Sequence, residues 1–267
     1  MVCLKTKALM PKNLLSLLLV LTLSFLIASP LASAKGMTLT GTNYPTVFVA
    51  GYAGWGQYDK INESFQYWGM QSGDLVKYLN TQGFESYAAS IDPVGSAWDR
   101  ACELYAQLTG TVVDYGQVHS AFYKHSRFGT DYSKCPLITG WGEKDANGSI
   151  KKVNFVGHSF GGATVRLLAQ LLANGSFEEL NGTRQSAVSS LFTGGKPDWI
   201  HSITTVASPH NGTTVVNIAI PLQSLFSSVH FSYIVPEHPG RLRPDRRCAR
   251  RRSFRIDAQG SQLLGKG

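Results

Sequence analysis

Apolar runs and amphipathic segments alternate along the middle of the chain and predict a series of strands and helices. Residues 46–50 form a continuous apolar run that ends at Gly51, which is typical of a buried parallel strand. Further strands are predicted at residues 86–91, 153–156 and 200–207, with helices at 73–83 and 97–108 between them. Strands that alternate with helices predict an α/β fold with a mostly parallel sheet and flanking helices.

The segment from Lys151 to Gly175 combines a strand, a sharp turn and a helix around Gly157-His158-Ser159-Phe160-Gly161. This is the G-x-S-x-G pattern of a nucleophile elbow, in which a strained turn exposes the serine hydroxyl. The strand before it is β-branched and aromatic, and Gly161-Gly162 lets the following helix pack closely behind the turn. Ser159 is therefore a candidate nucleophile. The alternative is a glycine turn with an incidental serine.

A serine nucleophile needs a base and two donors for the oxyanion that develops on the substrate. The first predicted donor is the backbone N–H of Phe160, directly after the serine, and the second belongs in the loop after the first strand. That loop is the glycine-rich segment 51–56, where the N–H of Tyr52 is the candidate. The alternative interpretation of the loop glycines is ordinary turn chemistry.

The N-terminal segment has the pattern of a secretory signal peptide. Lysines within residues 5–12 precede an apolar run at 14–27, and Ala32-Ser33-Ala34 is a small-residue cleavage site. We expect residues 1–34 to be removed and the protein to be secreted. A membrane anchor is the alternative, but the apolar run is shorter than the roughly 20 residues that a membrane span needs, so we expect no stable span.

The excess of basic over acidic residues in the chain comes from its two ends. Residues 35–240 carry a net charge of −2, although the whole chain carries +8. This charge distribution argues against a nucleic-acid partner. Residues 241–267 contain eight arginines and little apolar periodicity. We expect this tail to be disordered or to come from a shifted reading frame, which we favour, while an anion-binding arm is the alternative.

Four segments of the chain resemble secreted bacterial triacylglycerol lipases of the thermoalkaline Bacillus-type and staphylococcal group. They are VAGYAGWG (49–56), WDRACELYAQLTGTVVDYGQVHSAFYKHSRFG (98–129), VGHSFGGATVRLLAQLLANGS (156–176) and LFTGGKPDWIHSITTVASPHNGTT (191–214). The resemblance implies an α/β-hydrolase that cleaves acylglycerol esters through a Ser-Asp-His triad, with Ser159 as nucleophile. It assigns residues 35–240 to the N-terminal part of this domain. Ala50 departs from the family, which usually has histidine there.

The same resemblance implies a structural zinc ion, with three of its four ligands at Asp99, His119 and His125. Imidazole and carboxylate groups together suit tetrahedral zinc. Asp99 also has a rival role as a first-turn residue of its helix, in capping-box position relative to Ser96. The fourth ligand of the family lies farther along, in sequence that we expect this chain to lack.

We expect the triad to be incomplete. In the family the acid and base follow the serine by well over a hundred residues, so we assign neither role to Asp198 or His210. The sequence therefore predicts a secreted lipase or carboxylesterase, truncated at its C-terminal part, that is impaired in turnover and contacts lipid or ester at an interface. The alternatives are a non-catalytic lipid-binding remnant of the same scaffold, or peptidase or acyltransferase chemistry on the same fold.

Overall fold

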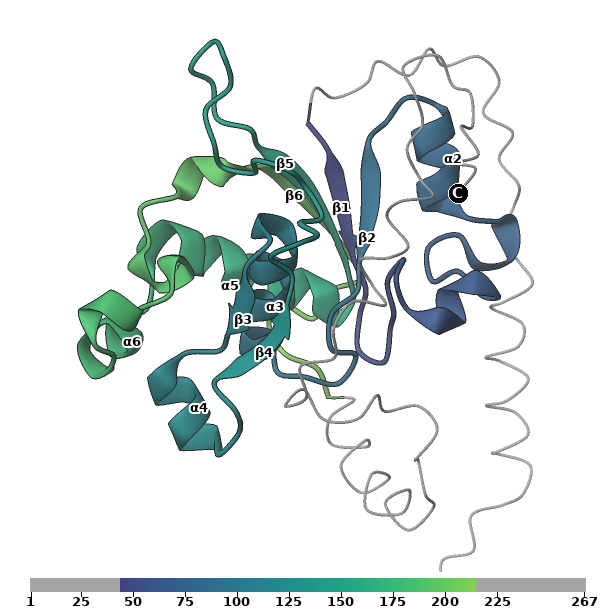
Figure 1. Cartoon of the computed structure of the whole chain (residues 1–267). Helices are drawn as coiled ribbons and strands as arrows, with labels where there is room; N and C mark the ends of the chain where they lie inside the picture. Colours follow the sequence, from purple (N-terminus) through teal and green to yellow (C-terminus); the bar gives the residue numbers. More distant parts are fainter. Residues whose placement is uncertain (1–43, 215–267) are drawn as a thin grey trace, which may run out of the picture. The chain divides into compact units, whose positions relative to one another are not determined.

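The computed structural model describes residues 44–214, which belong to one compact unit of the chain (Figure 1). Within this part, no helix combines the length and apolar character needed to cross a membrane. The expectations for a signal peptide at 1–34 and for the arginine-rich tail at 241–267 lie outside the described residues. What the structure describes is the segment that carries every candidate site residue.

The centre of the unit is a parallel sheet of four strands in the order β2-β1-β5-β6. Its strands are β1 (Thr46–Val49), β2 (Ser86–Ala89), β5 (Val153–His158) and β6 (Ile200–Val206). All four predicted strands are confirmed, within a few residues of their expected ends. In the register of β1 and β5, Val49 is opposite Gly157. The carboxyl end of β1 therefore lies beside the turn that carries Ser159.

Helices cover both faces of this sheet: α3 and α5 lie together on one face, and α2 lies on the other (Figure 1). The α-helices are α2 (Leu75–Thr81), α3 (Ala97–Thr109), α4 (Gln117–Tyr123), α5 (Phe160–Asn174) and α6 (Phe177–Gly182). The core between the sheet and helices α3 and α5 is built from buried aliphatic and aromatic side chains, among them Val47, Phe155, Leu104 and Leu168. This layering confirms the predicted α/β fold.

Helix α3 begins and ends where its sequence predicts. The Ser96 hydroxyl accepts a hydrogen bond from the Asp99 N–H at 3.1 Å, which satisfies one free donor of the first turn. At the other end Gly110 has φ 70°, a left-handed conformation that glycine adopts without steric cost. Nine consecutive residues from Arg100 to Leu108 are buried. The helix is thus enclosed between the sheet and the elements that follow it.

Several short elements between residues 110 and 199 were not predicted. Strands β3 (Val112–Asp114) and β4 (Phe128–Asp131) form a separate antiparallel pair, and α4 lies between them in sequence. Five single-turn 3-10 helices complete the described part: Lys60–Glu63, Met70–Ser72, Gln185–Ala187, Ser190–Thr193 and Pro197–Trp199. These segments contain neither a continuous apolar run, as the sheet strands do, nor a hydrophobic period sustained over a longer helix, which explains why the sequence pattern missed them.

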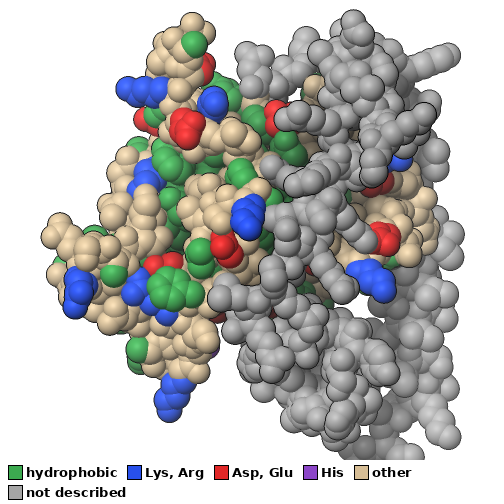
Figure 2. All heavy atoms as spheres, in the orientation of Figure 1, with side chains coloured by type: hydrophobic (Ala, Val, Ile, Leu, Met, Phe, Trp, Pro, Cys, Tyr) green, Lys and Arg blue, Asp and Glu red, His purple; other side chains and the backbone are tan. Residues whose placement is uncertain are grey.

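Charged side chains are interspersed over the face of the molecule drawn in Figure 2. Lysine and arginine side chains lie near aspartate and glutamate side chains over the described part of this face, without gathering into one basic patch (Figure 2). The distribution agrees with the small net charge that the sequence gives to residues 35–240.

Candidate active site and metal centre

Ser159 occupies the sharp turn between β5 and α5. Its backbone has φ 52° and ψ −126°, a strained conformation for a residue with a side chain. The turn is fixed on both sides, because the Ser159 N–H donates to the Val206 carbonyl at 2.9 Å and the Ser159 carbonyl accepts from the Gly162 N–H at 3.1 Å. Strained backbone of this kind persists where surrounding structure enforces it, and it is common at active sites.

Glycine allows three backbone segments to meet at this turn. A Cβ atom on Gly161 would lie 2.2 Å from the Val49 carbonyl oxygen, so only glycine lets α5 approach the end of β1 this closely. A Cβ atom on Gly51 would lie 2.7 Å from the Ser159 Cβ. The loop after β1 therefore passes directly beside the serine side chain.

The loop after β1 is a tight turn. The Gly54 N–H donates to the Gly51 carbonyl at 3.2 Å, and Ala53 has φ 56°. The Ala53 N–H donates to the Pro93 carbonyl at 2.7 Å, and the Gly51 N–H donates to the Tyr67 hydroxyl at 3.0 Å. Within residues 44–214, the N–H groups of Tyr52 and Phe160 make no hydrogen bond. No acceptor among the described residues therefore competes with a substrate for these two amides.

The adjacent His158 and the downstream His210 and Asp198 bond to partners other than the serine hydroxyl. His158 Nδ1 is 2.6 Å from the Tyr67 hydroxyl, and His210 Nε2 is 2.9 Å from the Thr205 hydroxyl. Asp198 pairs with Lys152, with 3.6 Å between the charged atoms. Among the described residues, no side chain is hydrogen-bonded to the Ser159 hydroxyl.

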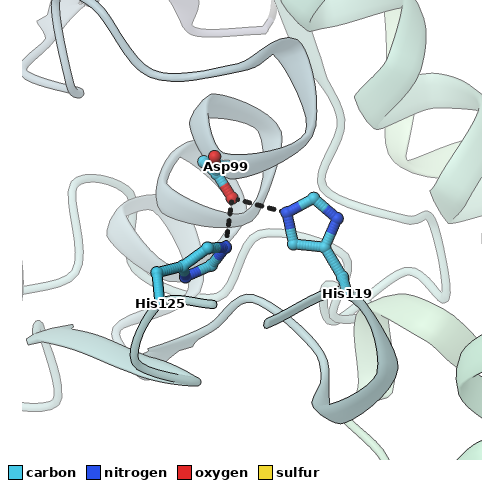
Figure 3. Close-up of side chains that lie close together, drawn as sticks. All are labelled: Asp99, His119 and His125. Atoms are coloured by element: carbon cyan, nitrogen blue, oxygen red, sulfur yellow. Dashed lines mark hydrogen bonds and ion pairs between the residues drawn. The ribbon is translucent and has the colours of Figure 1, made fainter. Parts of the chain in front are cut away.

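Asp99, His119 and His125 converge in one cluster (Figure 3). Asp99 comes from the first turn of α3, His119 from α4, and His125 from the loop that follows α4. Asp99 Oδ1 is 2.9 Å from His119 Nε2 and 3.7 Å from His125 Nε2. One ligand atom from each of the three residues lies within 4.8 Å of the others. The structure thus brings together the three side chains that the resemblance singled out.

The donor set of this cluster fits a zinc ion. His125 Nε2 is buried but makes no hydrogen bond within the described residues, which leaves a ring nitrogen available to a ligand. Burial raises the pKa of Asp99, but hydrogen bonds from His119 and Ser96 and the nearby imidazoles outweigh it, so that the pKa lies below its usual value. Two imidazoles and an ionised carboxylate are ligands that zinc prefers.

A buried carboxylate that the sequence did not single out holds α4 in place. Glu179, on α6, accepts hydrogen bonds from the N–H groups of Val118 and His119, at 3.1 and 2.8 Å. It also accepts from the Thr183 hydroxyl at 3.0 Å and is only 1% exposed. Glu179 thereby fixes the helix turn that carries His119. Sixty residues separate the two, so no local pattern could have predicted the contact.

Helices on both faces of a parallel sheet, with a serine on the strained turn between β5 and α5, define an α/β-hydrolase type of fold. Residues 42–226 match the family model described as "Lipase-like, C-terminal domain". The chain belongs to this lipase-like family.

Staphylococcal lipases are among its curated relatives. Lipase 2 of Staphylococcus aureus is 40% identical over 172 residues, which cover 64% of this chain and 24% of that protein. Lipase 1 of S. aureus strain MRSA252 is 40% identical over 179 residues, covering 66% of this chain and 25% of that protein. The chain thus spans about a quarter of the length of the curated relatives that it matches.

Solved structures of three bacterial proteins, two of them lipases by name, share the fold. Lipase 1 from Pelosinus fermentans is 45% identical with a TM-score of 0.61, covering 69% of this chain and 48% of that chain. EstA from Clostridium botulinum is 38% identical with a TM-score of 0.59, and the match covers 75% of this chain and 45% of that chain. The Staphylococcus hyicus lipase is 35% identical with a TM-score of 0.57, and the match covers 71% of this chain and 51% of that chain.

Proposed function

We propose that this chain carries the nucleophile and oxyanion site of a lipase-type ester hydrolase. The observation that carries the proposal is the strained turn at Ser159, which precedes Phe160 and lies beside the loop of Gly51 and Tyr52. The N–H groups of Tyr52 and Phe160 make no hydrogen bond within residues 44–214. A partly exposed serine beside N–H groups without a described acceptor is the arrangement that acyl transfer requires. Membership of the lipase-like family supports esters of fatty acids as the substrate class.

In the proposed reaction, the Ser159 hydroxyl oxygen attacks the carbonyl carbon of a bound ester. The carbonyl oxygen becomes negatively charged, and the N–H groups of Tyr52 and Phe160 donate hydrogen bonds to it. Collapse of the tetrahedral intermediate breaks the bond to the alcohol and leaves an acyl group on Ser159, which water then removes. Both steps need a base that accepts and returns a proton. Since no described residue hydrogen-bonds to the hydroxyl, we propose that turnover by this chain is slow.

The signal-peptide pattern at residues 1–34 supports secretion, where acylglycerol at a lipid–water interface is the substrate we propose. Asp99, His119 and His125 would hold a zinc ion at a distance from the reaction, with Glu179 orienting α4. Bound zinc would supply a cross-link between α3 and the segment that carries the two histidines. This is a structural role, and the ester reaction takes no step through the metal.

Covalent labelling of the purified chain tests the proposed function. Incubation with a p-nitrophenyl alkylphosphonate is expected to add one phosphonyl group, located on Ser159 by peptide mass spectrometry. Ser159→Ala should abolish the adduct, while replacement of the exposed Ser133 by alanine should leave it unchanged. Equal labelling of the wild type and Ser159→Ala would show that Ser159 is not the nucleophile.

Turnover and binding measurements separate the alternatives. We expect release of p-nitrophenol from an ester to be slow from the first equivalent onward, because acylation and deacylation both need a base and no described residue is hydrogen-bonded to the Ser159 hydroxyl. Fast turnover at steady state would contradict the proposed impairment and would indicate a base outside the described residues. Saturable binding of a long-chain ester without any adduct would instead favour a non-catalytic lipid-binding remnant of the scaffold. This alternative is supported by the Ser159 hydroxyl, which has no hydrogen-bond partner among residues 44–214.

Zinc is expected to stabilise the chain. A free zinc concentration one hundred times the dissociation constant should add about 2.7 kcal/mol to the free energy of unfolding, because the ion binds only the folded cluster. Calorimetry and thermal melting with and without a chelator measure this effect. His125→Gln should remove most of it, whereas His210→Gln, at an exposed histidine outside the cluster, should retain it. An unchanged melting temperature in the presence of zinc would contradict the metal site.

A further inference from the structure

We propose that Arg100, a buried arginine on α3, is the positioning residue that sets the relative placement of the two oxyanion amides. The inference rests on the proposed function and deepens it, because it names the side chain that holds the Tyr52 and Phe160 amides in place relative to each other. Arg100 is fully buried, and its guanidinium reaches three different segments around the nucleophile turn.

The first of these contacts is with the oxyanion loop. One terminal nitrogen of Arg100, Nη2, donates a hydrogen bond to the carbonyl of Ala50. Ala50 directly precedes Gly51 and Tyr52, so this bond fixes the chain just before the loop amide. The acceptor is a backbone group, and its position therefore determines the direction in which the loop leaves β1.

The second contact is with the nucleophile helix. Arg100 Nε donates to the Thr164 hydroxyl at 3.2 Å, and that hydroxyl donates in turn to the Phe160 carbonyl at 3.1 Å. The guanidinium carbon also lies 5.5 Å from the centre of the Phe160 ring, within range of a cation–π interaction. The same side chain is thus linked to the residue that supplies the second amide.

The third contact braces the loop from its outer side. Arg100 Nη1 donates to the Asp92 carbonyl. The next residue, Pro93, accepts the hydrogen bond of the Ala53 N–H at 2.7 Å. The Asp92 N–H donates to the Glu103 carboxylate at 2.6 Å, and Glu103 lies one turn after Arg100 on α3. One turn of α3 therefore holds both sides of the oxyanion loop.

Stability alone does not require an arginine at this position. A buried charge costs solvation free energy, and well-packed apolar side chains often replace buried ionic groups without loss of stability. What an apolar residue cannot do is donate from one rigid, planar group to three acceptors at fixed angles. The three contacts therefore fit a role in positioning the oxyanion loop and the nucleophile helix. Such a role predicts a lower rate of labelling at Ser159, whereas a role in core packing predicts only lower stability.

The test compares Arg100→Met with wild type in the rate of phosphonate labelling at Ser159. We expect the rate constant at saturating reagent to fall by about 100-fold, because a displacement of about 1 Å in a reacting group has that effect. The reagent concentration at half saturation should change less than about threefold, since Arg100 lies outside the binding surface. Arg166→Met, at an exposed arginine on α5, is the matched control and should label at the wild-type rate.

Two further variants keep the result interpretable if Arg100→Met folds poorly. Thr164→Val keeps the arginine and removes only the link to Phe160, so it should fold normally and lower the labelling rate by about tenfold. Arg100→Lys keeps the charge but not the planar group, and it should not restore the rate. Full labelling rates in folded Arg100→Met or in Thr164→Val would overturn the proposal.

Amide hydrogen exchange separates this inference from the proposed function. In Arg100→Met, exchange should accelerate in peptides that cover residues 50–54 and 92–95, while the remote loop 144–150 should be unchanged. If wild type forms no adduct, the proposed function fails, and exchange alone decides whether Arg100 orders the loop. Unchanged exchange at 50–54 would overturn the positioning role whatever the labelling shows.

Discussion

Replacing Gly161 by alanine is expected to lower the free energy of unfolding by about 3 kcal/mol, the upper part of the usual range for overpacking. The added Cβ would lie 2.2 Å from the Val49 carbonyl oxygen and 2.7 Å from that of Ala50. Both atoms belong to the backbone at the end of the central strand β1. They cannot rotate away like a side chain, so α5 would have to move off the sheet.

Urea denaturation followed by tryptophan fluorescence measures this change. Helix propensity by itself favours alanine over glycine by about 1 kcal/mol. The sign of the change therefore decides whether propensity or close packing dominates at this position. Gln170→Ala, at an exposed position of the same helix, is the control and should change stability by less than about 0.5 kcal/mol. A Gly161→Ala protein as stable as wild type would contradict the close approach of α5 to β1.

Gly51→Ala is expected to reduce phosphonate labelling of Ser159 by at least about 100-fold, the effect of losing an oxyanion donor. A Cβ on Gly51 would lie 2.7 Å from the Ser159 Cβ and 3.2 Å from its hydroxyl oxygen. The new methyl group would occupy space that the substrate carbonyl needs, and relief of the contact would move the Tyr52 amide away. Both effects lower the rate at which Ser159 reacts with the phosphonate.

The labelling rate and the melting temperature are measured together. Gly95→Ala, in the neighbouring loop, is the control, since the atoms nearest to its added Cβ belong to the Asp92 side chain, at 3.2 Å. This variant should label at close to the wild-type rate. A Gly51→Ala protein that labels as fast as wild type would show that the loop after β1 does not line the reaction site.

The sequence predicted the framework well because its signals are local. The apolar run of β1, the Ser96 cap of α3 and the glycines around Ser159 each act over a few residues, and all the predicted strands and helices of residues 44–214 are confirmed. The short strands β3 and β4 and the helix α4 were missed, because their sequences contain neither a continuous apolar run nor a sustained helical period.

Some residues of the candidate site could likewise be predicted from the sequence and others could not. Ser159, Tyr52 and Phe160 follow from a motif and remain predictions as functional residues, although the structure brings the loop after β1 beside the serine. Asp99, His119 and His125 were named through family resemblance, and the cluster forms only when α3 and α4 pack together. Arg100 and Glu179 were not singled out at all, because isolated charged residues in a sequence indicate a solvated surface more often than a buried contact.

The sequence by itself determined the order of strands and helices, the strained serine turn and the residue types available for chemistry. Each of these depends on backbone preference and hydrophobic period within about a dozen residues. Only the tertiary structure decided which charges are buried, and which backbone groups Arg100 and Glu179 bind across separations of 50 and 60 residues. The physical reason is that such contacts exist only once the sheet and helices have packed, since burial strengthens a hydrogen bond that water would otherwise replace.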